Sequence, residues 1–291
     1  MKKSVLIFSL LFFANSICNA QESGNRSYNQ QRRKPTVNST VLAGTSNGKD
    51  VYFVEANVAT NVKADAYTAV FGLSQEAPTA AESNSKINGL LAAFTRELSA
   101  LGIKNSDVFV DFITQNKVYD YTTSGNTTTE KFTGFETKKN IAVRYNDRES
   151  LEKIIAAAAK NSIFDLIKVD YLVNDTKSIN ARLYEEAVKI VKQKEAAYSN
   201  SFGIKMSPSN VANEKYDAFY PGELYAGYQA YESGNTYGDD DNRRVIQQRK
   251  TKTFYYEPLD ASDFDSVINS LGIEPMVQFT LYLRVQYELK K

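Results

Sequence analysis

The residues with the clearest potential for metal chemistry form an acidic run late in the chain. The run Asp239–Asp241 is followed by Asn242, and side-chain oxygens of these types are ligands that Ca²⁺ prefers. It lacks the spaced ligand order and the distant glutamate of an EF-hand loop, although Gly238 precedes it. We therefore expect a solvated acidic turn here, and no metal site.

Three further aspartates, Asp107, Asp111 and Asp120, fall in one predicted strand and raise the question of a carboxylate pair, as in glycoside hydrolases. Asp107 and Asp111 share a face of that strand but lie about 13 Å apart by strand rise, too far for direct cooperation. A catalytic pair would have to combine different strands. A hydrolase that relies on carboxylates alone stays an alternative, and it requires a concave pocket with two convergent acidic side chains.

A third group of candidate residues is aromatic and suits binding. Tyrosines crowd the region from about residue 205 to 270, which reads as a long irregular insertion. Tyrosine rings favour protein or glycan contacts, because each has an apolar body and a polar tip. We select as a candidate interaction surface Tyr220, Tyr225, Tyr228 and Tyr231. The alternative is that these rings fold back and cover an open edge or face of a sheet.

The first 20 residues have the pattern of a secretory signal peptide. Lys2 and Lys3 precede an apolar run from residue 5 to 14, and the small residue Ala20 marks the predicted cleavage site. Cys18 raises the possibility of a lipoprotein, which is cleaved just before an acylated cysteine. The lipoprotein signal needs a small residue before that cysteine, but residue 17 is isoleucine. We expect a periplasmic or secreted chain, and no later segment approaches the roughly 18–20 apolar residues of a transmembrane helix.

The composition of the mature chain excludes several kinds of catalytic and metal site. The sequence has no histidine, and Cys18, its only cysteine, lies in the predicted signal. Ser-His-Asp triads, Cys-His dyads and zinc sites built on His or Cys are therefore excluded. The net charge of +1 becomes −1 once Lys2 and Lys3 are removed, which argues against a nucleic-acid partner. We expect no catalytic residue and no cofactor.

Residues 21–49 are rich in Asn, Ser, Gln and Arg and have few large apolar residues, which indicates a flexible leader. Hydrophobic periodicity indicates one domain over residues 50–291. From residue 66 to 203 the predicted elements run β-α-β-β-α-β-α. This order predicts an α+β fold with a split β-α-β core, in which an antiparallel sheet carries helices on one face. Strict alternation over residues 277–289 predicts a C-terminal strand with one buried face, returning to the same sheet.

Several passages resemble the SIMPL domain, also called the DUF541 family. They are Asp65 before a strand, the Ala-rich helix that ends in LGI, GFETKKNIAVRYND, LEKIIAAAAK, YEEAVKIVKQK and the closing RVQYEL. The resemblance covers residues 51–203 and about the last fifteen. It implies an exported bacterial envelope protein from a family loosely linked to oxidative stress, with oligomeric members and no established catalytic residues.

Together these observations predict a non-catalytic, exported envelope protein that assembles with itself or binds an envelope partner. A surface-glycan-binding module that uses the tyrosines is the first alternative. The hydrolase that relies on carboxylates is the second.

Overall fold

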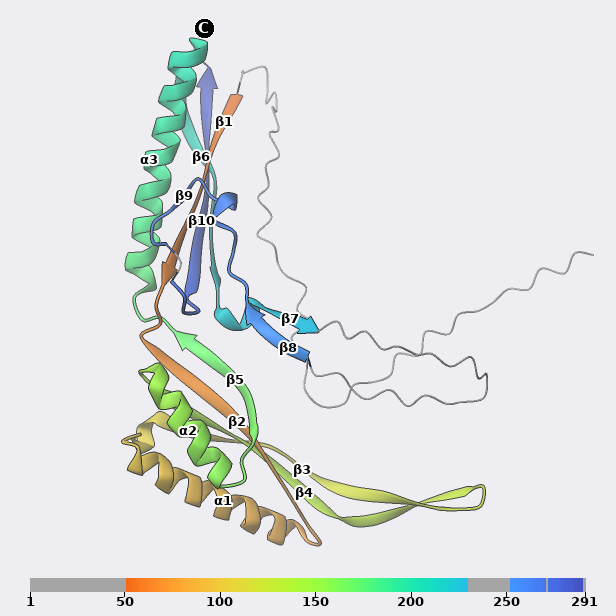
Figure 1. Ribbon diagram of the computed structural model, residues 1–291. Helices are drawn as coiled ribbons and strands as arrows, with labels where there is room; N and C mark the ends of the chain where they lie inside the picture. Colours follow the sequence, from red (N-terminus) through yellow and green to blue (C-terminus); the bar gives the residue numbers. More distant parts are fainter. Residues whose placement is uncertain (1–50, 230–251, 271, 290–291) are drawn as a thin grey trace, which may run out of the picture.

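The computed structural model describes residues 51–229, 252–270 and 272–289. Within these ranges the chain forms two four-stranded sheets, a separate two-stranded hairpin and three α-helices (Figure 1). The predicted α+β fold class is confirmed.

The first sheet is antiparallel throughout and has the strand order β3-β4-β2-β5. Its strands and helices are β2 (Ala66–Ala77), α1 (Ala80–Ala100), β3 (Val108–Ser124), β4 (Thr127–Tyr145), α2 (Arg148–Lys160) and β5 (Asp165–Leu172), with the short 3₁₀ helix η1 (Asn105–Asp107) before β3. Both helices cover the same face, where their apolar side chains share one core with β2 and β4 (Figure 1). This is the predicted antiparallel sheet with helices packed on one face.

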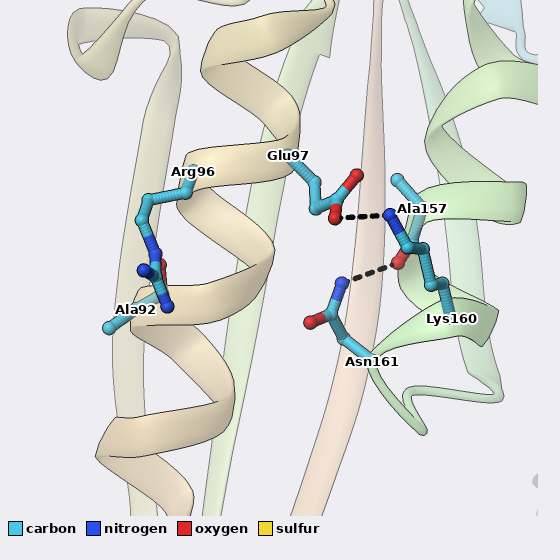
Figure 2. Close-up of polar contacts among 6 residues, drawn as sticks. All are labelled: Ala92, Arg96, Glu97, Ala157, Lys160 and Asn161. Carbon is cyan, nitrogen blue, oxygen red and sulfur yellow. Dashed lines mark hydrogen bonds and ion pairs between the residues drawn. The ribbon is translucent and has the colours of Figure 1, made fainter.

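Apolar packing holds α1 and α2 on this sheet. Phe94 of α1 is fully buried, and its ring meets that of Phe71 edge-on with 5.8 Å between the centroids. The two helices also share an ion pair, with 2.6 Å between Lys160 Nζ and Glu97 Oε1 (Figure 2). Exposed ion pairs contribute about 0–1 kcal/mol, whereas burying a phenylalanine side chain contributes about 1.5–3 kcal/mol. Burial therefore dominates the packing of these helices.

The second sheet has the order β6-β10-β1-β9. Its elements are β1 (Val51–Val62), α3 (Thr176–Phe202), β6 (Met206–Phe219), β9 (Ser266–Val267) and β10 (Val277–Leu289). β1 pairs with β10 along its whole length, from Val51 opposite Glu288 to Val62 opposite Val277. The two ends of the described chain are thus neighbours in one ladder.

The long helix α3 covers one face of the second sheet (Figure 1). Its buried residues recur at helical spacing and are Leu183, Ala187, Ile190 and Val191. The helix ends where predicted, at Gly203, which adopts the left-handed conformation with φ of 65°. None of the helices in the described ranges is long and apolar enough to cross a membrane.

The prediction that the C-terminal strand returns to the sheet of the β-α-β core is wrong. β10 pairs with β1 and β6, and none of these three strands belongs to the first sheet. The chain changes sheets between β1 and β2, over Lys63–Asp65. Alternation of apolar residues specifies which face of a strand is buried, but it does not specify the neighbouring strand.

The described parts of the region from residue 205 to 270 are more regular than predicted. β6 pairs with β10 over most of its length, and the 3₁₀ helix η2 (Pro221–Glu223) then leads into the hairpin of β7 (Tyr225–Gln229) and β8 (Lys252–Tyr256). The 3₁₀ helix η3 (Ala261–Asp263) precedes β9. The sequence of β6, MSPSNVANEKYDAF, is largely polar and contains Pro208, so it lacks the usual strand signal.

Asp65 links the two places where the chain passes between the sheets. Its backbone N–H donates to the Leu172 carbonyl at 2.8 Å, and its carboxylate accepts from the Asn174 N–H at 2.7 Å. Residue 65 leads from β1 into β2, and residue 174 leads from β5 into α3. The two connections are therefore held side by side.

A buried amide network ties the C-terminal strand to the segment before it. Gln278 and Asn61 are almost fully buried, and Gln278 Nε2 donates to Asn61 Oδ1 at 2.8 Å. Gln278 Oε1 accepts from the Leu259 N–H at 2.7 Å, and Asn61 Nδ2 donates to the Asn269 carbonyl at 2.6 Å. The network explains why Gln278, at a polar position of the alternating pattern, does not face solvent.

We predict that Gln278→Leu lowers the free energy of unfolding by about 1–3 kcal/mol, because it leaves the Asn61 side chain and the Leu259 N–H without their partner. Urea unfolding followed by circular dichroism measures the change. Gln286→Leu, on the same strand but only half-buried, is the matched control and should change stability by less than about 0.5 kcal/mol. Equal effects of the two substitutions would contradict a special role for the network.

Candidate functional site: an exposed edge strand and hairpin arm

The strand β3 lies at the edge of the first sheet and exposes large apolar side chains. Among the described residues its only strand neighbour is β4. Phe109 is 66% exposed and Phe112 is 55% exposed, and Val110 and Ile113 are also exposed. An edge strand of this length presents a row of unpaired backbone groups, and natural proteins usually protect such a strand. Here apolar residues flank that row on both faces of the sheet.

Beyond the sheet, β3 and β4 continue together as a hairpin arm over residues 118–134. β2 pairs with β4 only from Phe135 to Tyr145, so the arm has two strands and no third neighbour in the described chain. The arm extends away from the helices and from the second sheet (Figure 1). An isolated two-stranded hairpin is marginally stable in water. The arm therefore has the properties of an element that gains stability from a partner.

Local sequence explains how the arm forms. Ser124 pairs with Thr127, which leaves the two-residue loop Gly125–Asn126. Gly125 has φ of 58° and Asn126 does not have a positive φ, the pattern of a type II′ turn with glycine first. Such turns fit the twist of the flanking strands and fix their register. Threonines opposite one another continue the ladder, with 3.3 Å between the hydroxyls of Thr123 and Thr128.

Aromatic side chains cluster where the arm leaves the sheet. Tyr119 and Phe132 are directly opposite, and their ring centroids are 5.8 Å apart with an edge-on geometry. Phe132 makes a second edge-on contact with Phe135 at 5.4 Å. Tyr119, Tyr121 and Phe132 are nevertheless between 44% and 65% exposed. A partner could therefore bury additional ring surface on a framework that is already ordered.

The charges on the arm and edge are few and mixed in sign. Asp120 is directly opposite Lys131, and Tyr121 donates a hydrogen bond to Glu130 at 3.4 Å. Asp111 and Lys117 are exposed on the edge strand itself. These charges of both signs interrupt the row of apolar side chains but do not give the surface a strong net charge. The surface therefore suits backbone pairing and apolar contact better than electrostatic capture of a charged polymer.

The four tyrosines selected from the sequence lie elsewhere, around η2 and β7. Tyr220 precedes η2 and Tyr225 begins β7, and each is 37% exposed. The backbone of Tyr228 pairs with Thr253 in the β7–β8 hairpin. Tyr231 lies outside the described residues. The role of these tyrosines as an interaction surface stays a prediction.

The structure describes only some of the candidate carboxylates. Asp107 closes η1 instead of starting the strand, while Asp111 and Asp120 belong to β3. Asp239–Asp241 lie outside the described residues. Within the described ranges, no group of three or more acidic or cysteine side chains is arranged to hold a metal ion.

The sequence predicts β3 as a strand but gives little sign of its exposure. A run such as VFVDFI has apolar residues on both faces, which usually indicates a strand covered on both sides. Whether β3 is covered or exposed depends on the order of strands in the sheet, and that order is set by contacts distant in sequence. The one available signal is the length of the strand, which exceeds that of its neighbour β2. A hairpin longer than the sheet it joins must project from it.

A comparison with protein families identifies the domain. The family described as "SIMPL: Protein of unknown function (DUF541)" matches residues 53–248. The matched range includes β3, β4 and the arm, and it extends through β6 and β7. No curated protein matches the chain.

We predict that Gly134→Ala displaces the base of the arm. An added Cβ would overlap the Ala77 carbonyl oxygen, so the backbone must shift where β4 leaves β2. We expect a loss of about 1–3 kcal/mol in the free energy of unfolding, measured by urea unfolding. Gly89→Ala is the control, because Gly89 is an exposed helical residue at which a Cβ meets nothing within 4 Å. It should be neutral or stabilising by up to about 1 kcal/mol; a loss at Gly89 as large as at Gly134 would contradict the steric explanation.

Proposed function

Because the chain belongs to the SIMPL (DUF541) family, whose function is unknown, we propose that it is a non-catalytic, exported protein of the bacterial cell envelope that assembles with copies of itself through β3 and its arm. The observation that carries this proposal is the apolar edge strand continued by a two-stranded aromatic arm. Such an edge pairs readily with another strand.

A second copy of the chain is the occupant that best suits this edge. Two-fold dimers use one patch on both subunits, and two antiparallel β3 strands would meet this requirement. Each strand would supply the backbone groups that the other lacks, while Phe109 and Phe112 gain cross-strand neighbours and lose part of their contact with water. A strand of a copy also brings the same mixed charges, so no net repulsion opposes the approach. The arms would then lie across the partner and bury their exposed rings.

The proposal that the protein is non-catalytic is supported by composition and by the surfaces described above. The chain has no histidine, the commonest general base in enzymes. A cavity beside β5 is lined by one acidic residue, Glu274, and not by the pair that a carboxylate hydrolase needs. The proposal of export rests on the signal-like pattern of residues 1–20. A link to oxidative or envelope stress rests on the family resemblance.

Glycan binding remains the second candidate, and one observation favours it. Tyr220 and Tyr255 are partly exposed around η2 and β8, at 37% and 48%. Exposed tyrosine rings offer flat apolar surfaces with a hydrogen-bonding tip, which suit sugar rings. This hypothesis requires that the protein bind glycans while it stays monomeric.

We predict that residues 21–291 form a discrete oligomer, measured by size-exclusion chromatography with light scattering. Phe109→Lys combined with Phe112→Lys should give a monomer, because each lysine places a charge in the apolar row. Phe202→Lys is the matched control at an equally exposed phenylalanine on α3, and it should keep the oligomer. A monomeric wild-type protein would contradict the proposal, and retention of that monomer on a glycan array would favour the alternative.

We also predict that shortening the arm reduces the assembly. Replacing residues 120–131 by Gly-Asn would close the hairpin on the opposed pair Tyr119 and Phe132 with a loop of native length. Removing this contact surface should at least lower the association constant about tenfold, measured by analytical ultracentrifugation. Circular dichroism and urea unfolding check that the sheet remains folded. An unchanged association constant would show that β3 assembles without its arm.

A further inference from the structure

A cavity lies between the first sheet and the β7–β8 hairpin. Its volume is about 410 Å³, within the range of small-molecule sites. Aromatic rings from both sides border it, and one arginine lies at its edge. The residues that matter here are Tyr67, Tyr145, Tyr171, Tyr225, Phe254 and Arg148. This cavity is separate from the edge strand β3, since no residue of β3 lines it.

Three of these tyrosines form a row across the sheet. Tyr67 of β2 is opposite Tyr145 of β4 on one side and opposite Tyr171 of β5 on the other. The rings of Tyr67 and Tyr145 stack with 5.3 Å between centroids and 17° between planes, and Tyr171 meets Tyr67 edge-on at 5.1 Å. Tyr225 reaches the cavity from the hairpin, where its ring contacts that of Tyr256. The row presents a preformed aromatic wall.

The hydroxyls of Tyr145 and Tyr171 stay protonated at physiological pH, because burial raises the pKa of each. Burial raises the pKa of Tyr171 to about 12, with further contributions from Tyr225 and Tyr67 that Arg148 opposes. Burial also raises the pKa of Tyr145, assisted by the neighbouring tyrosines and Asp147. Within the described chain these hydroxyls have no hydrogen-bond partner in the protein. They are therefore free to donate to a ligand oxygen.

Arg148 places a positive charge at the cavity that no acidic side chain of the described residues neutralises. It begins α2, where the helix dipole disfavours a cation, and it forms no ion pair with an acidic residue of the described chain. The other charged residues that line the cavity are Lys168 and Glu274. Lys168 pairs with Asp170 at 2.7 Å, and Glu274 pairs with Lys63 at 3.7 Å. Among the described residues that line the cavity, Arg148 is thus the cation without an acidic partner.

We propose that this cavity binds a small, flat aromatic carboxylate, with its rings against the tyrosine wall and its carboxylate toward Arg148. The volume suits one or two fused rings and excludes a folded partner. Aromatic walls favour stacked or edge-on rings, and a guanidinium binds a carboxylate in a forked geometry. One cation without an acidic partner among the described lining residues fits one carboxylate better than a chain of phosphates. The proposal does not depend on self-assembly, because the cavity and β3 lie on different parts of the molecule.

Isothermal titration calorimetry of residues 21–291 with 2-naphthoate tests the proposal, and 2-naphthamide serves as the neutral probe of the same shape. We expect naphthoate to bind with one site per chain and at least about fivefold more tightly than naphthamide. Arg148→Gln should remove this preference. Arg96→Gln is the matched control, because Arg96 lies on α1 and its side chain bonds the Ala92 carbonyl of its own helix (Figure 2). It should leave both affinities unchanged.

A steric variant distinguishes the cavity from other apolar surfaces. Gly222 borders the cavity, and a Cβ there would meet no heavy atom within 4 Å, so Gly222→Phe can add a ring without a clash at its base. We expect it to abolish binding of both compounds with an unchanged unfolding curve. The Phe109→Lys and Phe112→Lys protein should bind as the wild type does. The proposal is overturned if naphthoate does not bind, or if it binds equally well to the Arg148 and Gly222 variants.

Discussion

The structure depends on how the chain passes twice between its two sheets. Asp65 holds both passages together, by its own N–H to Leu172 and by its carboxylate to the Asn174 N–H. Hydrogen bonds to a carboxylate are stronger than those between neutral groups, and these act on backbone that leads directly into β2 and α3. Each sheet has its own apolar core and its own helices. The junction at Asp65 therefore holds the two sheets together where the chain passes between them.

That arrangement separates two kinds of surface on the first sheet. β3 is one edge of the sheet and β5 is the other, with β4 and β2 between them. The apolar edge and its arm lie on the β3 side, whereas the tyrosine cavity is bordered by β5, the start of α2 and the hairpin. Pairing of copies through β3 leaves the cavity accessible. An assembly could thus display one ligand site for each of its chains.

The sequence predicts local structure well where a period of 2 or 3.6 residues continues over ten or more positions. β1, β2, both strands of the long hairpin and all three helices follow from such patterns. Which strands pair with one another is harder to predict. The clear alternation in β10 predicts a strand, but it does not reveal that this strand belongs to the second sheet. β6 is a strand because β10 lies beside it, and its own polar sequence gives no such indication. The tyrosine row has the same origin, because residues 67, 145 and 171 meet only through strand order.

The pairing of β1 with β10 also affects the order in which the parts of the protein can fold. The first sheet needs residues 66–172 alone, so its contacts can form once that stretch has left the ribosome. β1 comes earlier in the chain but has to wait for residues 277–289, more than two hundred positions later. Contacts of such long range form slowly because of the entropy of closing the intervening chain. β1, the first strand of the described residues, is therefore among the last elements to fold.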